Sequence, residues 1–277
     1  MPQEKPDTPC IIFFGMECSF SLPVLSALLR SGALVCAVVI PAGNNLAGTI
    51  LHAIDDEDIM LLPAPRMPGG LLPMAATSGL SSIVQLAWRH HIPVWRVRKL
   101  AAQSTLTTLT SYQPDLICVT CFDALLPSSV LHLPRLGCLN VHPSLLPELR
   151  GPMPLFWTFR LGHKLTGTTV HYMTPKLDSG AILAQEAIIV PDGIRYAELE
   201  ARCAQLGGEL LVRAVFDVYY GRAKPREQNE AQSSYRSYPC AEDYVVNVWE
   251  WSAPPLQFYL WGRKRGEPCN GGNSSYG

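Results

Sequence analysis

A chain of 277 residues can bury a sizeable core, and this length favours one large domain with an appendage. Hydrophobic residues make up 48% of the chain and charged residues 16%, which indicates a globular protein and excludes a disordered one. The formal net charge of −1 excludes a general long-range attraction for nucleic acid.

Neither a secretory signal nor a membrane span is expected. The first nine residues are polar and rich in proline, and no apolar run approaches the roughly 20 residues of a spanning helix. The nine cysteines lack the pattern of a small disulfide-rich domain, which favours reduced thiols in a cytoplasm. Cys118 and Cys121 form a CxxC pattern, but they lie in an apolar run and are expected to be core residues. No metal is expected.

Strand-like and helix-like segments alternate along the first half of the chain. In order, we expect a strand at 10–15, a helix at 21–30, a strand at 34–40, a helix at 81–90, a strand at 94–97, a helix at 99–111, a strand at 114–122 and a helix at 126–131. Ser21 is a candidate N-cap of the first helix. Residues 42–80 carry a weak pattern and are expected to form a long surface excursion. The alternation predicts an α/β fold with a doubly wound, mostly parallel sheet.

The second half continues the pattern and then changes in character. The expected elements are a strand ending at His142, a helix at 154–161, strands at 167–173 and 182–190, and a long helix at 196–220. We place the end of the main domain, 1–226, where polar residues replace the periodic pattern. Residues 227–266 are expected to form a small aromatic-rich subdomain, and 267–277 a disordered tail.

The most informative feature is a pair of polar residues at the end of an apolar run, Asn140 and His142. Residues i and i+2 of a strand point to one face, so both side chains can aim at one point, and Pro143 then ends the strand. An amide and a group that titrates near pH 7 suit acyl chemistry, in which negative charge develops on an oxygen. Asp178, in a loop between two apolar strands, is a third candidate that could hold His142 charged and relay a proton.

Two nearby residues are interpreted as structural. His171, on the strand before the Asp178 loop, is expected to be a satisfied core histidine. Ser144 is expected to be a turn or N-cap residue and not a nucleophile, because no Gly-x-Ser-x-Gly pattern surrounds it. No Gly-x-Gly-x-x-Gly pattern follows the first strand, which argues against a dinucleotide site there.

Longer motifs surround the three polar candidates. They are Phe-Phe-Gly at 13–15, Leu-Pro-Arg-Leu-Gly-Cys-Leu-Asn at 133–140, Asn-x-His-x-Ser-Leu-Leu-Pro-x-x-x-Gly at 140–151, Gly-Thr-Thr-Val-His at 167–171 and Leu-Asp-Ser-Gly at 177–180. From about residue 10 to 225 the chain therefore resembles the folate-dependent formyltransferases. That group includes methionyl-tRNA, glycinamide ribonucleotide and sugar amine formyltransferases, together with formyltetrahydrofolate hydrolases.

The resemblance implies a donor, 10-formyltetrahydrofolate, whose formyl group passes to an amine through a tetrahedral intermediate. It implies that Asn140, His142 and Asp178 are the catalytic residues, and that the pteridine lies against 120–127 and the Asp178 loop. The residues then expected to bind the cofactor are Phe122, Leu125, Leu126, Pro127, Ser144 and Ser179. Asp123 stands where relatives usually carry a small residue, so it either faces solvent or alters the mouth of the pocket.

The acceptor is expected to be a small-molecule amine, such as an amino sugar, an amino acid or a biosynthetic intermediate. Transfer RNA is the alternative. Residues 14–21 differ from the corresponding motif of the tRNA enzymes, and the residues after 226 are too few for their C-terminal β-barrel. A hydrolase that passes the formyl group to water is a third interpretation, and a folate-binding protein without an acceptor is a fourth. The sequence leaves a homodimer open.

Overall fold

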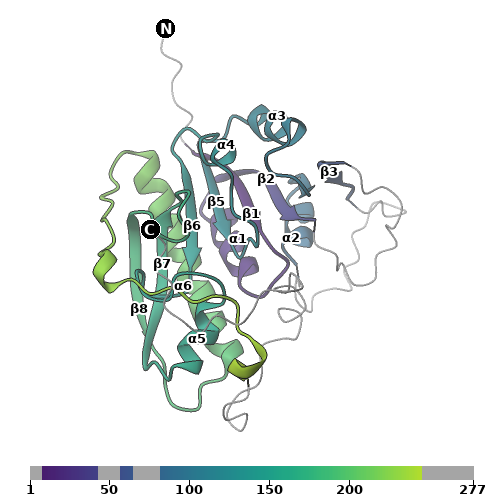
Figure 1. The fold of residues 1–277 in the computed structure, drawn as a ribbon. Helices are drawn as coiled ribbons and strands as arrows, with labels where there is room; N and C mark the ends of the chain where they lie inside the picture. Colours follow the sequence, from purple (N-terminus) through teal and green to yellow (C-terminus); the bar gives the residue numbers. More distant parts are fainter. Residues whose placement is uncertain (1–7, 43–56, 65–81, 245–277) are drawn as a thin grey trace.

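The computed structural model describes residues 8–42, 57–64 and 82–244, and these residues build one eight-stranded sheet flanked by helices (Figure 1). The strand order across the sheet is β3-β4-β2-β1-β5-β6-β7-β8. The elements are β1 (Cys10–Gly15), α1 (Ser21–Arg30), β2 (Leu34–Pro41), β3 (Ile59–Leu62), α2 (Ile83–Arg89), β4 (Val94–Val97), α3 (Gln103–Ser111), β5 (Leu116–Thr120), α4 (Ser128–Leu131), β6 (Cys138–His142), α5 (Pro154–Arg160), β7 (Leu165–Tyr172), β8 (Ile182–Ile189), α6 (Tyr196–Tyr219), η1 (Glu230–Gln232) and η2 (Ala241–Tyr244).

The centre of the sheet is parallel and its two margins are antiparallel. Strands β4, β2, β1, β5 and β6 pair in parallel, whereas β3 runs against β4, β7 against β6, and β8 against β7. This confirms the mostly parallel α/β sheet. β3 was not expected from the sequence. It lies in the weakly patterned stretch 42–80, and four residues are too few for a period of two to stand out.

The central strand β1 shows why the sheet carries helices on both faces. Ile11 and Phe13 belong to a core cluster that includes residues of α1, α2 and α6. Ile12 and Phe14 belong to a second cluster, which includes residues of α3 and α4. Successive side chains of a strand point to opposite faces, so these two clusters lie on opposite sides of the sheet. The doubly wound arrangement predicted from the sequence is therefore present.

Helix starts differ from the expected positions where local contacts compete. Ser21 opens α1 but does not cap it, because the residue at the cap position is Phe20 and the Ser21 hydroxyl lies 3.2 Å from the Sγ atom of Cys18. α3 begins at Gln103, since residues 99–102 form a turn. α4 begins at Ser128, after Pro127 in an extended conformation.

Beyond the last long helix the chain stays in contact with the body of the fold. Arg226 forms a bridge with Ile182, and Tyr235 forms one with Arg150. The domain boundary near 226 stays a prediction. The aromatic residues beyond Tyr244 and the expected tail at 267–277 lie outside the described residues, as does most of 42–80. Among the helices that the structure describes, none combines the length and apolarity needed to cross a membrane.

Candidate active site

Three elements bring four polar side chains together at the end of β6. Asn140 and His142 share one face of β6, as their spacing predicts. The antiparallel register of β6 and β7 sets His171 directly opposite Asn140. Asp178 enters from the loop between β7 and β8. Its Oδ2 atom lies 3.7 Å from His142 Nδ1, and its Oδ1 atom lies 3.7 Å from His171 Nε2 and 3.5 Å from Asn140 Nδ2.

The tautomer of His142 follows from its contacts. Nε2 lies 2.9 Å from the carbonyl oxygen of Leu149, and a carbonyl can only accept, so Nε2 carries a hydrogen and donates it. The other ring nitrogen, Nδ1, therefore faces Asp178 and is the atom that gains or loses a proton. Both side chains are almost fully buried, with 6% of His142 and 9% of Asp178 exposed, so water screens their interaction weakly.

His171 is buried, as expected, but it also belongs to the site. Its Nδ1 donates to the carbonyl oxygen of Tyr172 at 2.8 Å, which leaves Nε2 as an acceptor 3.2 Å from Asn140 Nδ2. Burial, more than any other cause, lowers the pKa of His171 to about 4, so the ring is neutral near pH 7. The sequence interpretation of His171 as a core residue therefore missed its contact with Asn140.

His171 and Asp178 together fix the orientation of the Asn140 amide. Both present acceptors to it, so the amide nitrogen must face them, and the reverse orientation would oppose oxygen to two acceptors. Oδ1 of Asn140 is then directed elsewhere and can accept a hydrogen bond. To donate a hydrogen bond to an oxyanion, Asn140 would have to break the hydrogen bond that one of its N–H groups makes to His171 or Asp178.

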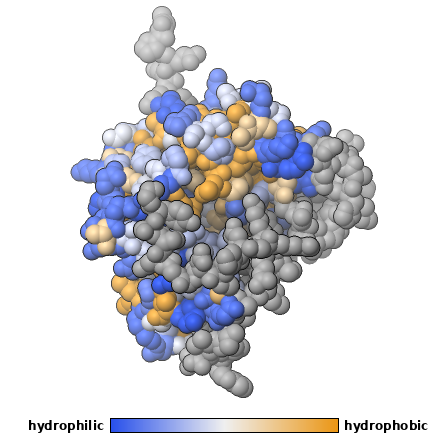
Figure 2. Space-filling view, viewed as in Figure 1, coloured by the Kyte–Doolittle hydropathy of each residue, from blue (hydrophilic) through white to orange (hydrophobic). Residues whose placement is uncertain are grey.

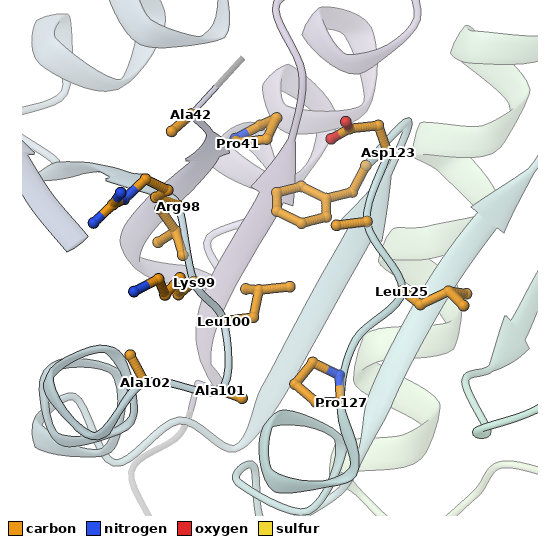
Figure 3. A pocket seen from close by; sticks show the side chains of 13 residues that line it. Pro41, Ala42, Arg98, Lys99, Leu100, Ala101, Ala102, Asp123, Leu125 and Pro127 are labelled. Carbon is orange, nitrogen blue, oxygen red and sulfur yellow. The ribbon is translucent and has the colours of Figure 1, made fainter. Parts of the chain in front are cut away.

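A pocket of about 660 Å³ lies at the carboxyl ends of β2, β4 and β5. Figure 3 shows Arg98 and Lys99 on one wall, with Asp123, Leu125 and Pro127 opposite them. On the face of the molecule drawn in Figure 2, apolar surface gathers in the upper middle, with hydrophilic surface to either side of it. Open α/β sheets bind ligands beyond the carboxyl ends of their parallel strands, the edge at which β6 also ends.

The residues predicted to bind the cofactor occupy three different surroundings. Phe122, Leu125 and Pro127 line the pocket, and 68% of Leu125 is exposed. Leu126 is buried in the second core cluster. The hydroxyls of Ser144 and Ser179 donate within their own turns, to the carbonyl oxygens of Glu148 and Lys176 respectively. Asp123 is exposed to solvent and also lines the pocket, and partial desolvation of its carboxyl group raises its pKa to about 6.

In the described ranges, no group of three or more His, Cys, Asp or Glu side chains is placed to hold a metal ion. What the geometry offers is a pair of groups that can share a proton, beside an oriented amide. Such a set suits the transfer of an acyl group between a bound donor and a nucleophile.

Residues 69–215 match the model of the formyl transferase family, and the chain belongs to that family. This confirms the resemblance drawn from the motifs. The chain is 37% identical over 175 residues to a methionyl-tRNA formyltransferase of Clostridium perfringens, covering 63% of this chain and 56% of the relative. It is 35% identical over 240 residues to a methionyl-tRNA formyltransferase of Syntrophus aciditrophicus, covering 85% and 67%. The chain thus spans only part of the length of these relatives.

Solved structures support the same fold at low sequence identity. A sugar N-formyltransferase from a Shewanella species has a TM-score of 0.56 at 15% identity, covering 83% of this chain and 77% of that one. HypX from Aquifex aeolicus, in complex with tetrahydrofolic acid, has a TM-score of 0.56 at 16% identity, covering 87% and 32%. At these identities the likeness concerns the fold alone.

Proposed function

We propose that the chain transfers a formyl group from 10-formyltetrahydrofolate to a primary amine. The observation that carries this proposal is the convergence of Asn140, His142 and Asp178 around one point at the end of β6. Membership of the formyl transferase family supports it, and so does the structure of the same fold that is described in complex with tetrahydrofolic acid.

The side chains divide the work by their hydrogen-bonding capacity. Nδ1 of His142 faces the Asp178 carboxylate, so this pair can take a proton from the attacking amine and return one to the departing nitrogen. Oδ1 of Asn140 can accept a hydrogen bond from an N–H of the amine and so orient the lone pair of the amine nitrogen. His142, once protonated, can stabilise negative charge that develops on the formyl oxygen.

The described pocket fits a flat heteroaromatic ring that carries a charged tail. Phe122 and Leu125 line it, and the basic residues Arg98 and Lys99 line its other wall. When bound, the donor supplies a formyl group on a nitrogen that leaves as an amine. We assign Phe122, Leu125 and Pro127 to its binding. Leu126 would act through packing beneath the pocket, and Ser144 and Ser179 through the turns that they stabilise.

For the acceptor we propose methionyl-tRNA. The relatives described above bear the name methionyl-tRNA formyltransferase, which favours the alternative acceptor over the small-molecule amine that the sequence led us to expect. The net charge of −1 remains the feature that favours a small amine. A cytoplasmic location belongs to the same proposal.

One assay with parallel reactions tests these assignments. The purified chain is mixed with 10-formyltetrahydrofolate and methionyl-tRNA, an amino sugar, an amino acid or no amine, and release of tetrahydrofolate is followed. Formylated methionyl-tRNA, identified by mass spectrometry, is the expected product. Release without any amine would instead indicate a hydrolase. Donor binding without release under any condition would indicate a folate-binding protein, and either result would overturn the proposed transfer.

A further inference from the structure

The described residues after α6 include a segment, Arg226–Arg236, that contains the short helix η1 and that we call the strap. Ser234 in the strap accepts two backbone hydrogen bonds, both at 2.9 Å. The N–H of Arg150 donates to the carbonyl oxygen of Ser234, and the N–H of Leu149 donates to its hydroxyl oxygen. The backbone N–H of Arg236 in turn donates to the carbonyl oxygen of Arg150 at 2.9 Å. The strap thus holds the loop whose Leu149 carbonyl fixes the ring of His142.

One strap side chain, Gln228, joins this loop to the Asp178 loop. Its amide nitrogen donates to the carbonyl oxygens of Asp178 and Gly180, each at 2.8 Å. Its amide oxygen accepts from Nε and Nη2 of Arg150 at 3.1 and 2.7 Å. The reverse orientation of the amide would set oxygen against two carbonyl oxygens, so the assignment is fixed by its partners.

Arg150 gives Gln228 a rigid support. Only 5% of Arg150 is exposed, and its guanidinium also donates to both carboxylate oxygens of Glu230, at 2.8 and 3.1 Å. The hydrogen bond from Arg150, followed by that from Lys176, lowers the pKa of Glu230 to about 2. A buried guanidinium with its donors satisfied is costly to displace, because moving it would leave a charge unpaired.

Asp178 is a residue that must be held in place. Its φ of +48° lies in the left-handed region, where a non-glycine residue is strained and persists only if its surroundings impose it. Two contacts do so. Gln228 holds its carbonyl group, and the backbone N–H of Gly151, the residue after Arg150, donates to its Oδ2 at 2.8 Å.

We propose that Gln228 is a positioning residue for the proposed formyl transfer, on which this inference rests. By joining Arg150 to the main chain of the Asp178 loop, it sets the distance between the Asp178 carboxylate and Nδ1 of His142. In this proposal Gln228 has no direct contact with the formyl donor or with the accepting amine. It acts through the carboxylate alone, so its effect depends on Asp178 being present.

Two substitutions of Gln228 and one control separate positioning from general stability. Gln228→Met keeps the length and removes every hydrogen bond. Gln228→Glu keeps an acceptor for Arg150 and removes the donors to the two carbonyls. Both should lower kcat by up to about 10²-fold, with the KM for the donor changed by less than about threefold. Gln232→Met, in the same strap but exposed, should leave kcat unchanged. Wild-type kcat in Gln228→Glu would overturn the inference.

A double-mutant cycle gives the sharper test. In an Asp178→Asn background, Gln228→Met should change kcat by less than about twofold, because the group that it positions has lost its charge. If instead the loss of kcat in the double mutant equals the product of the losses in the two single mutants, Gln228 contributes only to stability, and the inference is overturned.

A measurement independent of turnover distinguishes failure of the inference from failure of the proposed function. Hydrogen exchange of the Gly151 amide should accelerate in Gln228→Met and not in Gln232→Met, since that amide is bonded to Asp178. If the wild-type protein transfers no formyl group, the proposed function fails. The exchange rate of the Gly151 amide then still shows whether Gln228 holds Asp178 in place. Unchanged exchange in Gln228→Met would overturn it.

Discussion

Replacing Asp178 by asparagine tests the charge at the centre of the site while keeping the shape of the side chain. The contact from the Gly151 N–H can persist, because an amide oxygen accepts as a carboxylate oxygen does. What disappears is the negative charge 3.7 Å from His142 Nδ1. At an effective dielectric constant of about 20, that charge stabilises a protonated ring by about 4 kcal/mol.

A loss of about 4 kcal/mol of transition-state stabilisation lowers turnover by about 10³-fold. Binding of the folate should change by no more than a few-fold, because the charge matters most when the ring carries a proton. Asp192→Asn is a matched control, since that carboxylate is largely exposed and pairs with the surface residue Lys164. Single-turnover transfer and donor binding by fluorescence are the two measurements. If Asp178→Asn keeps its turnover within about tenfold of wild type, the assigned proton relay is wrong.

Three further substitutions probe other parts of the site and its support. Asn140→Ala should lower turnover by about 10²-fold or more with donor affinity nearly unchanged, and weakened affinity with normal turnover would contradict its role. His171 has a pKa of about 4 in the folded protein against about 6.5 unfolded, so the unfolded state binds more protons between these values and stability falls as pH falls through them. When the pH is lowered from 7.5 to 5, the free energy of unfolding measured in urea should therefore fall by about 2 kcal/mol less in His171→Gln than in wild type. Equal decreases would count against a neutral His171. At Gly151, φ is +102° and a Cβ would lie 2.2 Å from the carbonyl oxygen of Arg236, so Gly151→Ala should displace the strap and lower the urea midpoint. An unchanged midpoint would mean that the strap does not resist displacement.

Period-two spacing made part of the site predictable. Asn140 and His142 lie two residues apart at the end of an apolar run, and the structure places them on one face of β6. Asp178 entered through its motif and its place in a loop. The parallel core of the sheet followed from the alternation of strand and helix patterns, and it is confirmed.

What escaped prediction depends on register and on distant pairing. His171 has the local pattern of any buried strand residue, and only the antiparallel register of β6 and β7 sets it opposite Asn140. Gln228 lies in a polar stretch without periodicity, so nothing nearby in the sequence indicates that its partners are Arg150 and the Asp178 loop. The burial of Leu126 in the second core cluster could not be predicted either, because side-chain direction within a turn follows no simple period.

The strap also imposes an order on biosynthesis. Eighty residues separate Arg150 from the Glu230 carboxylate that pairs with it, and the strap follows α6 in the chain. During translation, the sheet and its helices can assemble while the guanidinium still lacks its partners. The contacts through which the strap holds the Asp178 loop would therefore form only after the sheet and its helices have emerged and assembled.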